Sequence, residues 1–336
     1  MKPTIDTGVI GASRHANALA EHLAPLPRLR LARWGPSPGG GDQPAAAALA
    51  RRAGVGFVPD WQEVVGEPSI RAVLVLSDAS QTTLAVETAL GAGKAVLCPV
   101  PAARTLPELD RLAAAIRRGH GLLLSPGAIR HTPAAKYALA EAAAGSLGRL
   151  HSVYAAARSA AQDGGNGGGV VDEIGWDIFD FVLGLTHAPV RRLHAAGAAW
   201  CEGAGGRDIA ALIVRFDDEL IATVELARCL PPGIAAEGEP EVEIEVIAAR
   251  QALRIEPYGS AVRVHRPGGS SLRPWLDAPV VSMAQDLAEA IDSGLSERES
   301  LDPHRRLAEV MSRATGAVAG DAGEYDRRDE CRSGPR

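Results

Sequence analysis

Two carboxylates, Glu173 and Asp177, are the residues whose type and spacing best suit chemistry. They lie four positions apart in a stretch with helical spacing, so both occupy one face of the predicted helix. A close pair of carboxylates suits acid–base catalysis, because each one changes how readily the other ionises. The alternative is that both face solvent or stabilise the helix N-terminus, where the helix dipole favours acidic groups.

Two further residues are candidates for holding a substrate. Trp176, beside Asp177, could stack on a sugar-like ring, although a buried core tryptophan gives the same pattern. Arg130 could bind an anionic or hydroxyl-bearing ligand near a cleft, or it could tie two domains together. A glycine-rich loop, Gly164–Gly169, leads into the acidic helix, so we expect the helix and its carboxylates to border a site.

The N-terminal segment carries a partial dinucleotide-binding turn. Gly11 supplies the tight turn after the first predicted strand, and Ala16 is a small residue suited to helix packing. Ser13 stands where a second glycine lets the backbone approach a pyrophosphate, so we expect its side chain to hinder that approach. At the end of the second predicted strand, Arg33 could meet the 2'-phosphate of NADP, or it could be a solvated arginine. The sequence thus predicts NADP or NAD as cofactor, with binding weak or lost.

Alternating strands and helices must position these residues. Residues 72–76 and 95–98 are short apolar runs separated by a helical segment, 82–90, which is typical of a βαβ unit in a parallel sheet. The same alternation continues through residues 1–125. We therefore expect a Rossmann-type α/β domain with a doubly wound parallel sheet over this range.

A second domain is predicted over residues 126–320. Its strands alternate more clearly and are separated by turn residues, which indicates an α+β domain with an open mixed or antiparallel sheet. We expect its terminal helices to pack back on the first domain, and the polar tail, 321–336, to be disordered. Alternating apolar residues, for example Leu212, Val214 and Phe216, predict an uncovered apolar face that mediates a homodimer or homotetramer.

Composition narrows the possible partners. The 336 residues carry a formal net charge of -6 and 46% hydrophobic residues, which fits a globular chain and argues against a nucleic-acid partner. The four cysteines show no zinc-site or disulfide spacing, so we expect no metal site and a reducing, cytoplasmic environment. No apolar run is long enough to predict a membrane span. A small-molecule ligand is the expected partner.

Three segments, in this order, resemble the Gfo/Idh/MocA family: AGKAVLC with its following proline, IRHTPAAKYALAEAAAGSLG, and GGGVVDEIGWDIFDFVLG. The resemblance implies an NAD(P)-dependent oxidoreductase acting on a sugar- or polyol-like metabolite. It implies that Glu173 and Asp177 replace the family's aspartate and catalytic histidine, and that Asp180 matches the aspartate that follows. It also implies that Ser77 lies in the cofactor cleft. The family's Glu-Lys-Pro strand end corresponds here to Pro99-Val100-Pro101, so the family's lysine is replaced by Val100.

Three functions follow from these residues. The first is a divergent NAD(P)-dependent oxidoreductase with Glu173 or Asp177 as the proton-transfer group. The second is a cofactor-independent lyase, isomerase or cyclase that uses the same two carboxylates. The third is a non-catalytic homologue that binds a ligand or pairs with an active subunit. The fold alone does not select among them.

Overall fold

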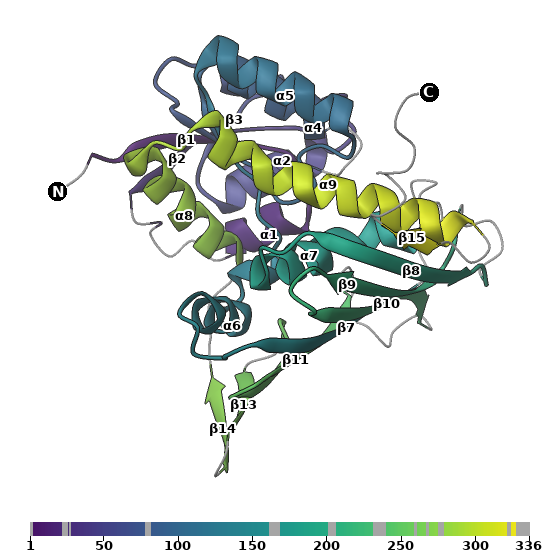
Figure 1. Ribbon diagram of the computed structural model, residues 1–336. Helices are drawn as coiled ribbons and strands as arrows, with labels where there is room; N and C mark the ends of the chain where they lie inside the picture. The colour runs from purple at the N-terminus through teal and green to yellow at the C-terminus, as the bar shows by residue number, and fades with distance from the viewer. Residues whose placement is uncertain are drawn as a thin grey trace. The chain divides into compact units, whose positions relative to one another are not determined.

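The computed structural model describes residues 3–21, 26, 28–77, 82–160, 169–200, 206–230, 240–258, 261–266, 269–274, 279–320 and 324–326 (Figure 1). The chain divides into two units. The first comprises residues 1–131 and 277–308, and the second comprises residues 132–276 and 309–336.

The first unit is built on a parallel sheet, which has six strands in the described part of the chain. Its strands are β1 (Ile5–Ile10), β2 (Leu29–Gly35), β3 (Gly56–Phe57), β4 (Ala72–Val75), β5 (Ala95–Leu97) and β6 (Leu122–Leu124). Their order is β3-β2-β1-β4-β5-β6, and every neighbouring pair is parallel. The order reverses between β1 and β4, and this reversal is the switch point at which such sheets bind ligands.

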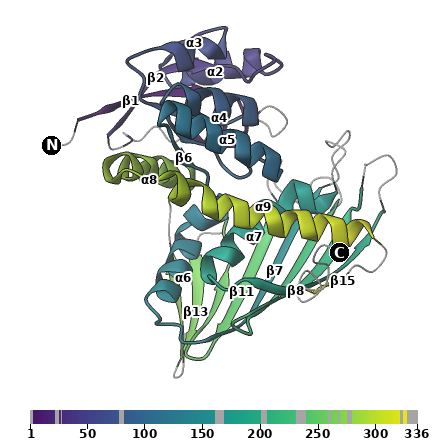
Figure 2. The same ribbon diagram turned by 45° about the horizontal axis from the view of Figure 1, so that its top comes forward.

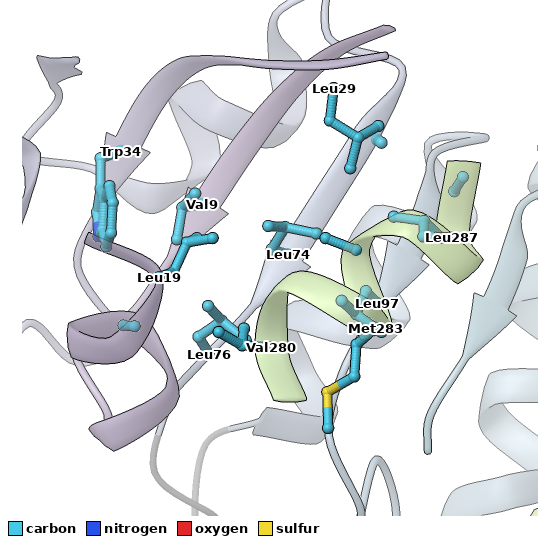
Figure 3. Close-up of a cluster of buried hydrophobic side chains, with 14 of the residues drawn as sticks. Val9, Leu19, Leu29, Trp34, Leu74, Leu76, Leu97, Val280, Met283 and Leu287 are labelled. Atoms are coloured by element: carbon cyan, nitrogen blue, oxygen red, sulfur yellow. The ribbon is translucent and has the colours of Figure 1, made fainter. Parts of the chain in front are cut away.

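Helices cover both faces of this sheet (Figure 2). They are α1 (Arg14–Glu21), α2 (Gln43–Arg52), α3 (Trp61–Gly66), α4 (Thr82–Gly91), α5 (Leu106–Gly119) and α8 (Pro279–Ser293). One apolar cluster joins α1, α2 and α8 to the sheet, with Val9, Leu74, Leu97 and Met283 among its fully buried side chains (Figure 3). Helix α8, which comes from the C-terminal part of the chain, is therefore part of the first unit's core.

The second unit is built on a mixed sheet, which has nine strands in the described residues. These are β7 (Leu150–Ala160), β8 (Val190–Ala198), β9 (Ile209–Phe216), β10 (Ile221–Leu230), β11 (Glu241–Ala248), β12 (Ala252–Ile255), β13 (Ala261–Arg266), β14 (Gly269–Pro274) and β15 (Glu324–Asp326). Their order is β14-β13-β12-β11-β7-β10-β9-β8-β15. Strands β7 and β10 pair in parallel, and the other neighbouring pairs are antiparallel. The predicted fold class, a Rossmann-type parallel sheet followed by an open mixed sheet, is confirmed.

One face of the second sheet carries helices α6 (Pro133–Ala143) and α7 (Val170–Leu185) (Figure 2). A Cβ on Gly175 of α7 would stand 3.3 Å from Leu226 of β10 and 3.3 Å from Met311. Met311 belongs to the second half of α9 (Glu297–Ala319), so α7 lies between the sheet and this part of α9.

The predicted apolar face of this sheet requires a correction. Leu212, Val214 and Phe216 were expected to remain uncovered, but they are 0%, 0% and 1% exposed. They share the inward-facing positions of β9 and are covered by the helical layer, which buries this side of the sheet. The outward positions carry the exposed residues instead, including Ile213 and Ile221 at 49% and 42% exposure.

Two sequence expectations fall wholly or partly outside the described residues. The glycine loop lies there except for Gly169, and the tail from residue 321 lies there except for Glu324–Asp326, which pair with β8. Among the helices that the structure does describe, none has the length and apolar character needed to cross a membrane.

Candidate functional site

Gly11 forms a tight turn between β1 and α1 at the carboxyl end of the parallel sheet. Its φ is +102°, and a Cβ would stand 2.6 Å from the Cα of Ser77 and 2.7 Å from the carbonyl oxygen of Leu76. The Gly11 amide donates to the carbonyl of Gly35 (3.0 Å), and the Ser13 amide donates to the carbonyl of Leu76 (3.0 Å). The turn is therefore tied to the ends of both β2 and β4, and only glycine fits there.

The turn opens onto the N-terminus of α1, where backbone N–H groups favour an anion. Ala16 is fully buried where α1 packs on the sheet. The Ser13 hydroxyl is inaccessible to water and has no hydrogen-bond partner among the described residues. Burial and, secondarily, the charge of Arg14 lower the pKa of His15 to about 3, so this imidazole is neutral near pH 7. An orphaned hydroxyl beside a helix N-terminus fits a dinucleotide pyrophosphate that supplies the missing partner.

Trp34 and Arg33 lie at the end of β2, on opposite sides of the strand. The Trp34 indole is fully buried and its Nε1 donates to the carbonyl of Gly11 (2.9 Å), so it braces the turn. The Arg33 guanidinium pairs with Glu67 (3.3 Å), which lies between α3 and β4. In a parallel sheet that connection runs along the amino edge. The structure therefore places the Arg33 charge away from the carboxyl ends of the strands.

The other predicted residues of the cleft are Ser77, after β4, and the segment after β5. The Ser77 hydroxyl lies 3.2 Å from that of Thr82, the first residue of α4, and the intervening residues 78–81 are outside the described structure. The chain after β5 runs through a cis Val100–Pro101 peptide bond. Val100 occupies the place of the family's lysine in the resemblance, and a valine side chain cannot transfer a proton.

In the second unit, α7 carries the predicted acid–base residues. Glu173 and Asp177 are one helical turn apart, with Glu173 exposed and Asp177 half-buried. Asp180 and Trp176 are deeper, at 6% and 5% exposure. The Trp176 Nε1–H is buried and has no hydrogen-bond partner among the described residues.

An ionic cluster that is buried except at Glu173 anchors the first turn of α7. Arg228 of β10 pairs with Asp208 (2.9 Å) and Glu173 (3.0 Å), and the side chains of these three residues are 4%, 0% and 28% exposed. Burial alone would lower the pKa of Arg228, but the hydrogen bonds to Asp208 and Glu173 raise it, so the guanidinium stays charged. The Glu173 side chain is therefore held in place by a permanent cation.

The same end of the sheet holds the helix backbone in place. The Val170 amide donates to the carbonyl of Arg207 (2.8 Å), and the Trp200 amide donates to Asp208 (2.7 Å). Sequence reasoning missed Arg228 and Asp208. The available signal was a charged residue at an inward position of β10, in alternation with Ala222, Val224 and Leu226.

Arg130 lies in a short 3-10 helix, η1 (Ile129–His131), of the first unit. The adjacent His131 is 7% exposed, and its Nδ1 lies 3.4 Å from Asp286 and 3.5 Å from Ser282, both on α8. Both contacts involve the same ring nitrogen, so these three residues do not form a Ser-His-Asp relay, which needs one contact on each nitrogen. They fasten η1 to α8.

Comparison with known proteins identifies a matching family model and solved structures of similar fold. Residues 5–127 match the family model GFO_IDH_MocA, described as an oxidoreductase family with an NAD-binding Rossmann fold. A uridine-diphosphate-N-acetylglucosamine 3-dehydrogenase from Acidithiobacillus ferrooxidans aligns with 95% of this chain and 99% of its own, at 18% identity and a TM-score of 0.76. A putative myo-inositol dehydrogenase from Sinorhizobium meliloti aligns over 96% and 99%, at 19% identity and a TM-score of 0.75. The family model therefore matches within the first unit, and the two solved structures share the fold of the chain.

Other solved structures share the whole fold. An oxidoreductase from Agrobacterium radiobacter, in complex with NAD+, L-tartaric acid and magnesium, covers 97% of this chain and 99% of its own, with 14% identity and a TM-score of 0.79. A levoglucosan dehydrogenase, in complex with NADH and levoglucosan, covers 96% and 99%, with 18% identity and a TM-score of 0.77. At these identities the likeness shows the fold alone. A comparison with curated protein sequences gives no match.

The family binds NAD(P) through its Rossmann domain. In this chain the corresponding unit keeps the left-handed Gly11 turn and the small Ala16, and it replaces the second glycine by Ser13. Within the described residues, no group of three or more histidine, cysteine, aspartate or glutamate side chains is arranged to hold a metal ion.

Proposed function

We propose that this chain is an NAD(P)-dependent oxidoreductase that acts on a sugar- or polyol-like small molecule, with Glu173 and Asp177 as its acid–base pair. The observation that carries the proposal is the Gly11 turn. Its positive φ and the 2.6 Å approach to Ser77 exclude every other residue type, in a unit that matches an NAD-binding family model. A turn this constrained is expected where a pyrophosphate must approach the backbone.

The residues that would hold the dinucleotide are Gly11, Ser13, Ala16 and Ser77. The orphaned Ser13 hydroxyl supports a polar ligand beside the turn, while its side chain narrows the approach to the backbone. We therefore propose that affinity is weak compared with a turn that has glycine at this position. When bound, the nicotinamide accepts a hydride from, or returns one to, a substrate carbon.

The two carboxylates of α7 have different surroundings, which supports different roles. Glu173 is held by Arg228 at 3.0 Å, so it suits a fixed acceptor for a substrate hydroxyl. Asp177 is half-buried one turn further on. We propose that it takes up and returns the proton of the reacting hydroxyl. Because Val100 cannot move a proton, Asp177 takes the role that the family's lysine and histidine otherwise fill. We propose Arg130, Trp176 and Asp180 as further residues of the substrate site.

The class of substrate is proposed from the neighbours. Structures of similar fold are named for a nucleotide sugar, for inositol and for levoglucosan, all of which carry several hydroxyl groups. Two carboxylates on one helix suit a ligand of this kind, because each can accept hydrogen bonds from adjacent hydroxyls.

The test is a spectrophotometric search for NAD+ or NADP+ reduction with myo-inositol, levoglucosan and glucose, run in parallel on wild type and Asp177→Asn. We expect turnover with at least one polyhydroxyl compound and its loss in the variant. If the protein binds a dinucleotide but turns over none of a broad set of such compounds, and Asp177→Asn changes nothing, the role assigned to Asp177 is wrong.

A second candidate is a cofactor-independent lyase, isomerase or cyclase that uses Glu173 and Asp177. Val100 favours this candidate. It stands where the family has the lysine beside the nicotinamide, while the two carboxylates are still present. Such an enzyme would convert its substrate without any absorbance change at 340 nm and without added dinucleotide. A non-catalytic partner subunit is the third candidate, and it would tolerate Asp177→Asn without loss of its complex or of the complex's activity.

We also propose that the chain forms a homodimer or homotetramer through the outward face of its second sheet. Ile213 and Ile221 are exposed there on neighbouring strands. A two-fold axis would place this exposed apolar pair of one copy against the same pair of the other.

A further inference from the structure

The carboxyl end of β2 is where this fold contacts the adenosine ribose of a dinucleotide. In this chain β2 ends at Gly35, whose carbonyl oxygen accepts a hydrogen bond from the Gly11 amide (3.0 Å). The strand end therefore lies directly beside the glycine turn, but Gly35 has no side chain to offer. The contact must come from another residue.

Arg33 is not placed for that contact. Its guanidinium pairs with Glu67, on the connection that enters β4 from the amino edge of the sheet. Glu67 also accepts hydrogen bonds from the amide and hydroxyl of Ser69, and these bonds are the main reason that its pKa is lowered. Glu67 therefore remains a carboxylate that holds Arg33 on this side.

The loop after β2 brings a different charge to the strand end. Ser37 is two residues beyond Gly35, and the carboxylate of Asp42 accepts hydrogen bonds from its amide (2.8 Å) and its hydroxyl (2.6 Å). Gly39 and Gly40 adopt positive φ values of 91° and 70°, which let the intervening chain fold back on itself. A half-buried carboxylate is thereby fixed two residues past the strand.

Asp42 has the position of a helix cap but not the contacts of one. It is the N-cap residue of α2, yet its carboxylate makes no capping hydrogen bond to the described first turn of that helix. Both of its oxygens instead face Ser37. Each carboxylate oxygen can accept a second hydrogen bond, so capacity for two hydroxyl donors remains.

We infer that Asp42, rather than Arg33, contacts the adenosine ribose and makes this chain prefer NAD(H) over NADP(H). The inference rests on the proposed function, since it requires a bound dinucleotide. The 2'- and 3'-hydroxyls of the ribose would donate to the Asp42 carboxylate. The 2'-phosphate of NADP(H) would bring negative charge against the same carboxylate.

The test measures affinity and not turnover. The full chain is titrated with NADH and with NADPH, and binding is followed by nicotinamide fluorescence and by calorimetry. We expect wild type to bind NADH more tightly by on the order of tenfold to a hundredfold, as a charge-assisted hydrogen bond and the loss of a repulsion together imply. Asp42→Asn should remove most of this ratio, because it deletes the charge but keeps an oxygen to accept from Ser37.

Controls separate ribose recognition from loop closure. Arg33→Ala should leave the ratio of NADH to NADPH affinity unchanged, and Asp42→Glu should keep NADH preferred. Asp42→Ser is a second neutral variant, in case the asparagine variant folds poorly. A wild type that prefers NADPH, or neutral variants in which both affinities fall by the same factor, would overturn the inference while leaving the proposed function intact. If neither dinucleotide binds, the inference and the proposed function fail together.

Discussion

Replacing Arg228 by methionine should destabilise the second unit strongly, because this residue neutralises two carboxylates at the start of α7. Asp208 is fully buried and lies 2.9 Å from Arg228, and Glu173 lies 3.0 Å away with 28% of its side chain exposed. Methionine conserves most of the buried volume but removes the cation. Breaking a buried pair by removing one partner costs about 3–5 kcal/mol.

The two carboxylates contribute unequally to this cost. Glu173 can regain water, so its share should be at most about 1 kcal/mol, as for exposed ion pairs. Asp208 cannot, so it should account for most of the loss. For a unit of this size, each kcal/mol lowers the melting temperature by roughly 2–4 °C, and the variant should therefore melt about 10 °C below wild type.

Thermal unfolding at several pH values checks this estimate. A buried aspartate that has lost its cation has a raised folded-state pKa, so the variant's deficit should shrink as pH falls and Asp208 takes up a proton. Arg228→Met combined with Asp208→Asn should recover part of the loss. Arg158→Met is the matched control, since Arg158 forms an exposed pair with Glu225 at 3.6 Å and should shift melting very little. A melting temperature within about 2 °C of wild type, or a deficit independent of pH, would refute the role given to Arg228.

Three further results are expected. If the chain is an enzyme, Asp177→Asn should lower turnover on the order of 10² to 10⁴ in steady-state assays with little change in melting temperature, and an unfolded variant would show instead that this carboxylate is structural. Burial depresses the folded-state pKa of His15 to about 3, so the unfolded chain binds the extra proton between about pH 6.5 and pH 3. Stability should therefore fall as pH drops through this range, and His15→Leu should flatten the curve in pH-dependent denaturation; an unchanged slope would contradict the burial of this imidazole. Light scattering at micromolar concentration should show a dimer or tetramer that Ile213→Lys weakens, and a monomeric wild type would contradict assembly through the outward face of the second sheet.

The fold could be predicted because its strongest signals are local. Two short apolar runs, Ala72–Val75 of β4 and the run that begins at Ala95, are typical of parallel strands buried on both faces, and a helix lies between them. Which side of the second sheet is covered could not be read from the same patterns. Both sides of β9 carry apolar residues, and only the packing of the helical layer distinguishes Leu212, which is buried, from Ile213, which is exposed.

The candidate site was only partly predictable, for a similar reason. Gly11 could be predicted because its turn requires a glycine. Glu173 and Asp177 could be predicted because their helical spacing puts them on one face. Arg228 is 55 residues from its partner Glu173, so nothing in the sequence pairs them before the sheet forms. The contact between Asp42 and Ser37 could not be predicted either, although the two residues are close in sequence. It forms only because the glycines between them fold the loop back.

The most direct test of the account is calorimetric titration of the full chain with NADH, for wild type and Gly11→Ala. A methyl group on Gly11 would stand within 2.7 Å of three backbone atoms of Leu76 and Ser77, so the turn could not keep its shape. We expect saturable binding to wild type at one site per chain, weakened at least about tenfold in the variant, as the loss of one good hydrogen bond to a charged group would do. The absence of saturable binding to wild type, or equal binding by a folded variant, would contradict it.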